Sequence, residues 1–298
     1  VLVCGTNAWS GALSHSLTIT AGTTDATLEG RLHATAGNLT VNDVMLQADG
    51  VGGDGGVLLL ENGITTLNDV VVTCGANVPE NGGAIAAIDA NRLALNRVEL
   101  EGCAATGAGG AVYSDGTTVD VRESRFVDNT AAEGGAIWLG GDGASVSTDD
   151  ATVWQGNVVT GRGGALYFQT GNHSLTAGQG VPTFEFNRAG LVGGAVFSGG
   201  GALPDALYVE NTAGQGGALY IEHAGSTVTG TFQSNRATVR GGAVALGPQA
   251  TNQVVGGSFT GNVVGETCSN STLSQCTGRG GAIAADAGFV VDVGSSFT

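Results

Sequence analysis

The stretch Phe232–Leu246, FQSNRATVRGGAVAL, contains the unit that the rest of the chain repeats. An aromatic residue, two variable residues and an asparagine lead through a short polar segment to Gly-Gly-Ala and an aliphatic run. The Gly-Gly-Ala part recurs with its first glycine at Gly82, Gly109, Gly134, Gly163, Gly193, Gly216, Gly241 and Gly280, and a relaxed copy starts at Gly55. Self-similarity at a spacing of roughly 26 residues predicts a solenoid, in which each repeat packs only against its neighbours.

The residues between the glycines are typical of strands and turns. They are rich in valine, threonine and isoleucine, and no segment keeps the apolar spacing that an amphipathic helix needs. About 26 residues are enough for one coil of a parallel β-helix, and adjacent coils then lie ~4.8 Å apart. The sequence therefore predicts an all-β fold, a parallel β-helix (solenoid) of roughly 10–11 coils.

Each position of the repeat has a physical role in such a stack. The paired glycines suit a corner where the backbone takes a positive φ. An aliphatic column follows them and is expected to point inward: Ile85, Val112, Ile137, Leu166, Val196, Leu219, Val244 and Ile283. A second column predicts a stacked core: Leu100, Phe126, Trp154, Phe184, Tyr208, Phe232, Phe259 and Phe297. The asparagines three residues later are expected to hydrogen-bond from coil to coil.

In these two motifs the chain resembles the polymorphic membrane protein repeat of chlamydial and other surface proteins, which is defined by GGA[ILV] and FxxN. The resemblance covers roughly Gly55–Thr298. It implies a right-handed parallel β-helix that is exported to a cell surface, often as an autotransporter passenger or adhesin. These repeats identify a scaffold and do not name a ligand.

The pattern is less regular in residues 1–54 than in residues 55–298. Alternation in Ser16–Gly30 suggests that the stack begins near Leu17, with Val1–His15 contributing to a cap. We expect residues 1–54 to form irregular N-terminal coils, residues 55–298 to carry the repeats, and the two parts to make one continuous solenoid. The last repeat stops within its motif at Phe297-Thr298, so we expect the chain to be part of a longer solenoid.

Charge and hydropathy exclude several classes of partner. The net charge is −16 and the chain contains no lysine, so no basic patch for nucleic acid is expected. No apolar run approaches the ~18–20 residues of a membrane-spanning helix, so no membrane insertion by this segment is expected. No motif for a cofactor or a metal is found, and none is predicted.

The cysteines suggest an oxidising compartment. Cys74 and Cys103 occupy the asparagine position of successive coils, so their Cα atoms should lie within the ~4.4–6.8 Å range of a disulfide. Cys268 and Cys276 flank an insertion and are predicted to form a second disulfide, which leaves Cys4 over. Disulfides indicate an extracellular setting, and free buried thiols are the alternative.

Three sequons are also present, at Asn38, Asn172 and Asn270. They would accept glycans only if the source is eukaryotic.

An enzyme is the main rival interpretation, because polysaccharide lyases also use parallel β-helices. Such sites need clustered acids. Asp149 and Asp150 are adjacent, and Asp120, Asp128 and Asp142 are candidate neighbours. Neighbours on a strand point to opposite faces, so Asp149 and Asp150 would not line one cleft if they lie in a strand. A solvated acidic corner is the simpler interpretation, and the four histidines share no position in the repeat.

The candidate contact surface is the column directly after the aliphatic one. Five successive coils carry aromatic residues there: Tyr113, Trp138, Tyr167, Phe197 and Tyr220. Alternation places this column outside if Ile85 and its equivalents point inward. The rings would then form an exposed stripe roughly 19 Å long. Alternatively, the column faces inward or lies under a flanking loop. Glu133 and Arg162, just before the glycines, are expected to pair across coils.

These observations favour a non-catalytic extracellular or cell-surface scaffold. It would act as an adhesin, a passenger, or a subunit of a surface layer or filament, in contact with a surface protein, a glycan or neighbouring copies. The alternative is a carbohydrate-active β-helix enzyme of the polysaccharide-lyase kind. A groove with three or more converging carboxylates would favour the enzyme.

Overall fold

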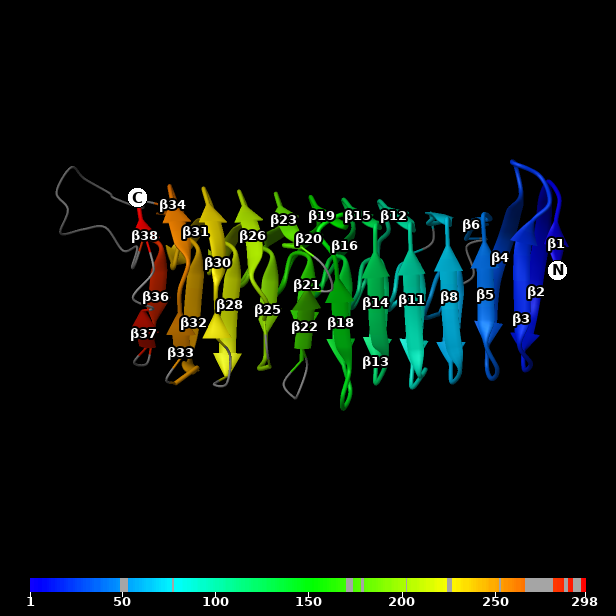
Figure 1. Cartoon of the computed structure of the whole chain (residues 1–298), viewed down its shortest axis with the longest axis horizontal. Coiled ribbons are helices and arrows are strands. Elements are labelled where there is room, and N and C mark those ends of the chain that lie inside the picture. The colour runs from blue at the N-terminus through cyan, green and yellow to red at the C-terminus, as the bar shows by residue number, and fades with distance from the viewer. Residues whose placement is uncertain are drawn as a thin grey trace.

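The computed structural model is a single elongated stack of coils (Figure 1). It describes residues 1–298 except 49–52, 77, 170–173, 178–179, 202, 224–226, 252, 266–280, 287–288 and 292–295. The described residues contain strands and turns and no helix, and therefore no helix that could span a membrane. Every pairing between strands is parallel, for example β10 with β13 and β12 with β15. The predicted all-β parallel solenoid is confirmed.

The largest sheet contains two ladders of strands, one on each side of a corner. Ladder 1, which from β7 onward carries the residues after the glycine pairs, consists of β2 (Thr6–Leu13), β4 (Thr27–Ala34), β7 (Leu58–Glu61), β10 (Ile85–Ile88), β13 (Val112–Asp115), β17 (Ile137–Gly140), β21 (Leu166–Phe168), β25 (Val196–Ser198), β28 (Leu219–His223), β32 (Val244–Gln249) and β36 (Ile283–Ala285). Ladder 2 starts at the first residues of β4 and carries the aromatic motif: β6 (Met45–Gln47), β9 (Val71–Thr73), β12 (Glu99–Glu101), β15 (Arg125–Val127), β19 (Val153–Gln155), β23 (Thr183–Glu185), β26 (Ala206–Val209), β30 (Gly230–Gln233), β34 (Ser258–Thr260) and β38 (Ser296–Phe297).

Three smaller sheets complete the coils. An eight-stranded sheet consists of β1 (Leu2–Val3), β3 (Leu17–Ala21), β5 (Leu39–Asn42), β8 (Ile64–Asn68), β11 (Arg92–Asn96), β14 (Thr118–Arg122), β18 (Ser145–Thr148) and β22 (Ser174–Ala177). A three-stranded sheet consists of β29 (Thr227–Val228), β33 (Gln253–Val255) and β37 (Phe289–Val291). A six-stranded sheet consists of β16 (Thr130–Ala131), β20 (Val158–Val159), β24 (Arg188–Ala189), β27 (Thr212–Gln215), β31 (Arg236–Arg240) and β35 (Val263–Val264).

The stack begins closer to the N-terminus than the sequence suggested. β1 pairs with β3, and β2 pairs with β4 over its whole length, from Thr6 opposite Thr27 to Leu13 opposite Ala34. The segment Val1–His15 therefore supplies paired strands to the ladders, and the prediction that the stack begins near Leu17 is wrong. The reason is that β2 lacks the glycine pair by which the other coils were recognised.

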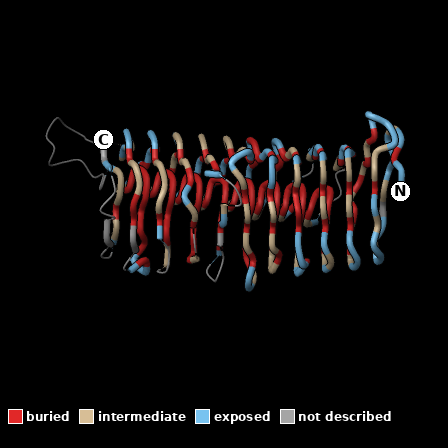
Figure 2. Tube along the Cα trace, in the orientation of Figure 1, coloured by how far each residue is buried: buried red, intermediate tan, exposed pale blue. Residues whose placement is uncertain are grey.

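The aliphatic column points inward as predicted. Ile85, Val112 and Ile137 lie opposite one another in consecutive strands, and each is fully buried. Figure 2 shows this buried interior running along the stack. Because a one-residue shift would turn the whole column to the other face, the register fixes which residues form the core.

The aromatic motif forms a second buried column. Phe126, Trp154, Phe184, Tyr208 and Phe232 have exposed fractions of 0%. Their rings stack from coil to coil with centroid separations of 4.5–5.7 Å, from Phe126 on Trp154 to Trp154 on Phe184. The Trp154 indole also donates a hydrogen bond to the Thr148 hydroxyl at 3.2 Å. The predicted aromatic core is confirmed.

The asparagines form the predicted ladder. The Asn157 side-chain amide donates to Asn187 Oδ1 at 3.0 Å and to the Phe126 carbonyl at 2.9 Å. The same pattern links Asn129, Asn157, Asn187, Asn211, Asn235 and Asn262. Asn129, Asn157 and Asn187 have no exposed surface, so each amide replaces hydrogen bonds that water would otherwise supply.

The two glycines of each pair have different roles, which corrects the expectation of a shared positive φ. Gly216 has a φ of +61°, a conformation that favours glycine. Gly217 is not in that region. A Cβ at Gly217 would lie 2.1 Å from the carbonyl oxygen of Gly242 in the next coil and 2.6 Å from the Arg236 nitrogen. The second glycine is therefore required for close backbone packing.

Tyr208 places a polar hydroxyl group in the apolar core. Its hydroxyl is buried and has no hydrogen-bond partner among the described residues. Burial raises the pKa of this phenol above its usual value, with a further contribution from Asp205. Tyr208→Phe should therefore increase the free energy of unfolding by ~1 kcal/mol at neutral pH, since it removes a buried group without leaving a partner unpaired. Chemical denaturation of both proteins measures the difference, and a loss of stability would show that the hydroxyl has a partner.

The chain has four tyrosines, and the pKa of each is raised. Below pH ~10 the phenols are neutral in both the folded and the unfolded chain. Above that pH only the unfolded chain releases these protons, so stability should fall as the pH rises toward the folded pKa values. The melting temperature should therefore drop as the pH rises above ~10, and it should drop less in Tyr208→Phe. Equal drops in both proteins would contradict the assignment to this residue.

Candidate functional site

The candidate contact surface is built by five consecutive strands of ladder 1. Tyr113, Trp138, Tyr167, Phe197 and Tyr220 lie opposite one another in β13, β17, β21, β25 and β28. We call these five residues the outer aromatic stack. Their ring centroids are 4.6, 6.0, 4.8 and 5.8 Å apart in chain order, with interplanar angles of 6–10°. The rings are therefore stacked in parallel, one above the next.

The outer aromatic stack faces away from the central core. Tyr167, Phe197 and Tyr220 form a hydrophobic cluster of their own with Ala245, whereas the neighbouring aliphatic column belongs to the main core cluster. Trp138 lies over Gly140, two residues along the same strand: a Cβ at Gly140 would be 2.1 Å from the indole Cη2. Residues two apart share a face of a strand, so Trp138 and Gly140 lie on the same side of β17.

The stack is less exposed than the sequence suggested. Tyr167, Phe197 and Tyr220 are 7%, 2% and 7% exposed, and only Tyr113 and Trp138 are half-buried. The prediction of an exposed stripe is therefore wrong for three of its five residues. The first reason is that stacked rings cover one another's faces. A covering column of residues just before the glycine pairs is the second reason.

The covering column includes Arg162 and Val192. The Arg162 guanidinium carbon lies 5.9 Å from the Tyr167 ring centroid and 5.3 Å from that of Phe197, within range of a cation–π interaction. Val192 packs against the same cluster. Arg162 also pairs with Glu133, Nε to Oε1 at 3.2 Å, which confirms the predicted ion pair. This pair is half-exposed, so its own contribution to stability is ~0–1 kcal/mol.

The two ends of the stack differ. Beyond Tyr220 the column continues with Ala245 and Ala284. There Arg240 binds Gln215 Oε1 through Nε at 2.5 Å and also pairs with Asp286, so the far end is closed. At the near end Tyr113 follows Ala86 in the ladder. Burial and then the charges of Asp115 and Asp54 raise the pKa of Tyr113 to about 12, so its hydroxyl is a neutral donor at physiological pH.

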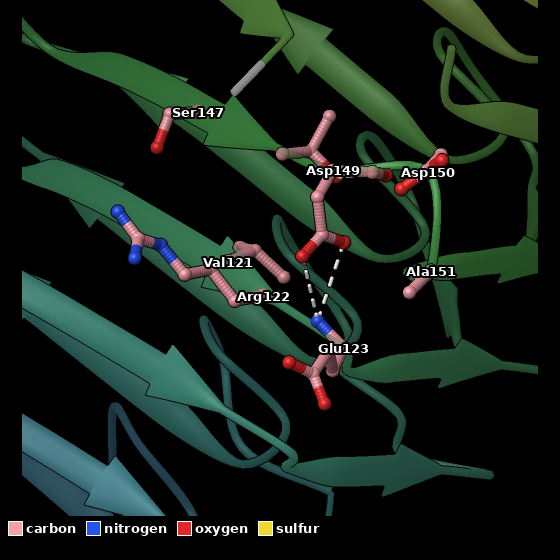
Figure 3. A pocket seen from close by; sticks show the side chains of 8 residues that line it. Val121, Arg122, Glu123, Ser147, Asp149, Asp150 and Ala151 are labelled. Atoms are coloured by element: carbon pink, nitrogen blue, oxygen red, sulfur yellow. Dashed lines mark hydrogen bonds between the residues drawn. The ribbon is translucent and has the colours of Figure 1, made fainter. Parts of the chain in front are cut away.

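The acidic residues form a hollow at the corner after β18 (Figure 3). It has a volume of about 360 Å³ and is lined by Arg122, Glu123, Ser147, Asp149, Asp150 and their neighbours. Asp149 and Asp150 lie in the turn after β18, so the alternation of a strand does not apply to them. The Asp149 carboxylate accepts hydrogen bonds from the Glu123 backbone nitrogen, at 3.2 and 3.1 Å, and from the Thr152 hydroxyl at 2.7 Å. It therefore stabilises the turn.

The other acids near this hollow are held apart. In Figure 3 the carboxylates of Glu123 and Asp150 point away from that of Asp149. Asp120 is bound by Arg92 and by the Ser147 hydroxyl. Asp128 lies at a different corner, beside Gly156 of the next coil. Over the described residues, no three His, Cys, Asp or Glu side chains are grouped as metal ligands would be.

The disulfide between Cys74 and Cys103 is present, as the coil positions predicted. Their Cα atoms are 5.2 Å apart. Cys4 is exposed and free, while the predicted pair Cys268 and Cys276 lies outside the described residues. Of the three sequons, Asn38 is exposed just before β5, and Asn172 and Asn270 lie outside the described residues.

Mass mapping without reduction should find Cys74 linked to Cys103 and Cys4 open to alkylation. Because the crosslink spans 29 residues, Cys103→Ala should lower the free energy of unfolding by ~2–4 kcal/mol. Reducing agent should weaken the original protein by a similar amount and leave the variant unchanged. Alkylation of both Cys74 and Cys103 in the untreated protein would remove this evidence for an oxidising compartment.

The outer aromatic stack is therefore half-exposed at its Tyr113–Trp138 end. In the hollow after β18, Asp149 is bound to the turn by hydrogen bonds. Comparison with known proteins adds no relative, because no protein-family model, no curated protein and no solved structure matches this chain.

Proposed function

We propose that this chain is a non-catalytic scaffold outside the cell or on its surface, acting by contact as an adhesin, a passenger or a subunit of a layer. The observation that carries the proposal is the outer aromatic stack, which lies on the outer face of ladder 1 and ends in the half-buried Tyr113 and Trp138. The repeat motifs themselves are used inside the stack, as core, asparagine ladder and close-packed corners. The choice of binding partner therefore depends on the side chains that point outward.

Two further features support an extracellular setting. The disulfide between Cys74 and Cys103 is typical of an oxidising compartment. The GGA[ILV] and FxxN motifs resemble the polymorphic membrane protein repeat, whose members are exported to cell surfaces.

A glycan is the partner that best suits the Tyr113–Trp138 end. Aromatic rings that are half in water favour flat apolar faces, and a sugar ring presents such a face together with hydroxyls. Asp115 follows Tyr113 by two residues in β13 and lies opposite Gly140 in the ladder. Its carboxylate can accept hydrogen bonds from hydroxyls close to the rings.

Replacing Tyr113 and Trp138 together by serine tests this proposal. Binding to immobilised glycans and adhesion to cells should weaken at least ~10-fold, while the melting temperature falls by only a few degrees. The matched control is Ile64→Ser, which removes a side chain of 38% exposure from β8, away from this surface. Unchanged binding by the double variant, or an equal loss in the control, would contradict a role for this surface.

The alternative function, a carbohydrate-active enzyme, is favoured by one feature. The hollow after β18 holds Glu123, Asp149 and Asp150 within one wall of the solenoid. The hydrogen bonds of Asp149 to the turn argue against it as a free acid or base.

A further inference from the structure

The outward face of the six-stranded sheet combines exposed apolar side chains with arginines. One column of this sheet, of which Ala131, Val159 and Ala189 are members, points inward and forms a small buried cluster. The alternate column points outward, since residues next to each other on a strand face opposite sides. Its members lie opposite one another in consecutive strands: Val158, Arg188, Thr212, Arg236 and Val263. Val158 and Val263 are 39% and 47% exposed.

Phe186 is the most unusual residue on this side of the molecule. It lies two residues before Arg188, is 47% exposed, and has a φ of +57°. Other coils have Gly156, Glu210 or Ser234 at this corner position. A bulky residue in this conformation is an outlier, and such strain is common at binding sites. Leu191, just after the same strand, is 59% exposed.

The two arginines of this face are free to pair with another molecule. Arg188 and Arg236 are exposed, and neither forms an ion pair with a described residue. This is notable in a chain with ten basic and 26 acidic residues. We call Val158, Phe186, Arg188, Leu191, Arg236 and Val263 the arginine face. Aromatic residues with arginine are enriched in protein interfaces.

A complementary surface exists in the N-terminal half of the same chain. Asp43 and Asp69 line an open hollow of about 510 Å³ together with Ala21–Thr24. Met45 and Val71 lie opposite each other in ladder 2, and each is 40% exposed. Asp69 is bound by Arg97, whereas Asp43 has no ion pair with a described residue. We call Asp43, Met45, Asp69 and Val71 the acidic face.

We propose that the arginine face binds the acidic face of a second copy of this chain. The charges of the two faces are complementary, because Arg188 and Arg236 form no ion pair with a described acid and Asp43 forms none with a described base. Both faces also carry exposed apolar side chains beside these charges, such as Phe186 and Met45. The two faces are different surfaces, so the contact is head-to-tail and can propagate into a filament or layer. The net charge of −16 repels copies in general, so association requires such a specific pair of surfaces.

This inference rests on the proposed scaffold function and names neighbouring copies as partner, but its test uses other residues. Sedimentation velocity of the whole chain from ~1 to ~500 µM should show concentration-dependent association. Arg188→Glu with Arg236→Glu should weaken association at least ~10-fold, and so should Asp43→Arg. An equimolar mixture of these two variant chains should regain association, because opposite charges again face each other. A monomer at every concentration, or variants that associate as the original does, would overturn the proposal.

Phe186→Gly distinguishes a loss of association from a loss of folding stability. Glycine accepts the positive φ without strain, so the melting temperature should stay the same or rise, while association weakens at least ~10-fold. Association that is unchanged in this variant would remove Phe186 and the arginine face from the contact. The glycan-binding test above depends on Tyr113 and Trp138, so either proposal can fail while the other holds.

Discussion

Replacing Asn187 by leucine should lower the free energy of unfolding by ~3–5 kcal/mol. Asn187 donates to the Trp154 carbonyl at 2.9 Å and to Asn211 Oδ1 at 3.1 Å, and it accepts from the Asn157 backbone and side chain at 3.0 Å. Leucine would leave these partners buried and unpaired. Each such group costs ~1–3 kcal/mol.

Asn68→Leu is the matched control for this ladder. Asn68 donates to Asn42 Oδ1 at 2.8 Å and accepts from Asn96, but these residues are only part-buried. Water can replace the lost hydrogen bonds there, so the expected cost is ~1 kcal/mol or less. Urea denaturation of both variants gives the comparison. Equal costs would mean that burial does not determine the strength of the asparagine ladder.

Gly217→Ala should cost at least ~3 kcal/mol, although alanine is usually a mild substitution. The new methyl group would lie 2.1 Å from the Gly242 carbonyl oxygen, with the Arg236 backbone 2.6 Å away. Both neighbours are backbone atoms of the next coil, so the coils must separate locally and lose parallel hydrogen bonds. Overpacking of this kind cannot be relieved by a change of rotamer.

Gly102→Ala isolates the contribution of backbone conformation. Gly102 has a φ of +64°, and nothing lies within 4 Å of its added Cβ. Only the left-handed conformation opposes alanine there, which costs ~1–2 kcal/mol. Thermal denaturation should therefore give a clearly lower melting temperature for Gly217→Ala than for Gly102→Ala. The reverse order would contradict the role of the second glycine in coil packing.

The repeat made the core predictable from sequence. Ile85 and Asn157 each belong to a column that recurs in neighbouring coils, so one register fixes the environment of all its members. The disulfide between Cys74 and Cys103 followed from the same reasoning. In a solenoid a residue's neighbours are the equivalent residues one repeat away. Long-range contacts can therefore be predicted from the spacing of the repeat.

The outer surface was harder to predict, because side-chain conformation decides it. The orientation of Phe197 followed from alternation, but its burial depends on Arg162 reaching across from another column. The second asparagine ladder, Asn42, Asn68 and Asn96, has a sequence signal in the segments TVND, TLND and ALNR, which lie outside the GGA[ILV] and FxxN motifs. The direction in which Asp149 points depends on a turn, where no period applies.

Turnover is the measurement that most directly tests the central claim that this solenoid acts by contact and not by catalysis. The chain should be incubated with a panel of neutral and acidic polysaccharides, and new reducing ends and unsaturated products measured over time. The scaffold account predicts no turnover above a heat-denatured control, together with binding that depends on Tyr113 and Trp138. Turnover that disappears in Asp149→Asn or Glu123→Gln, with folding preserved, would contradict it and establish the hollow after β18 as an active site.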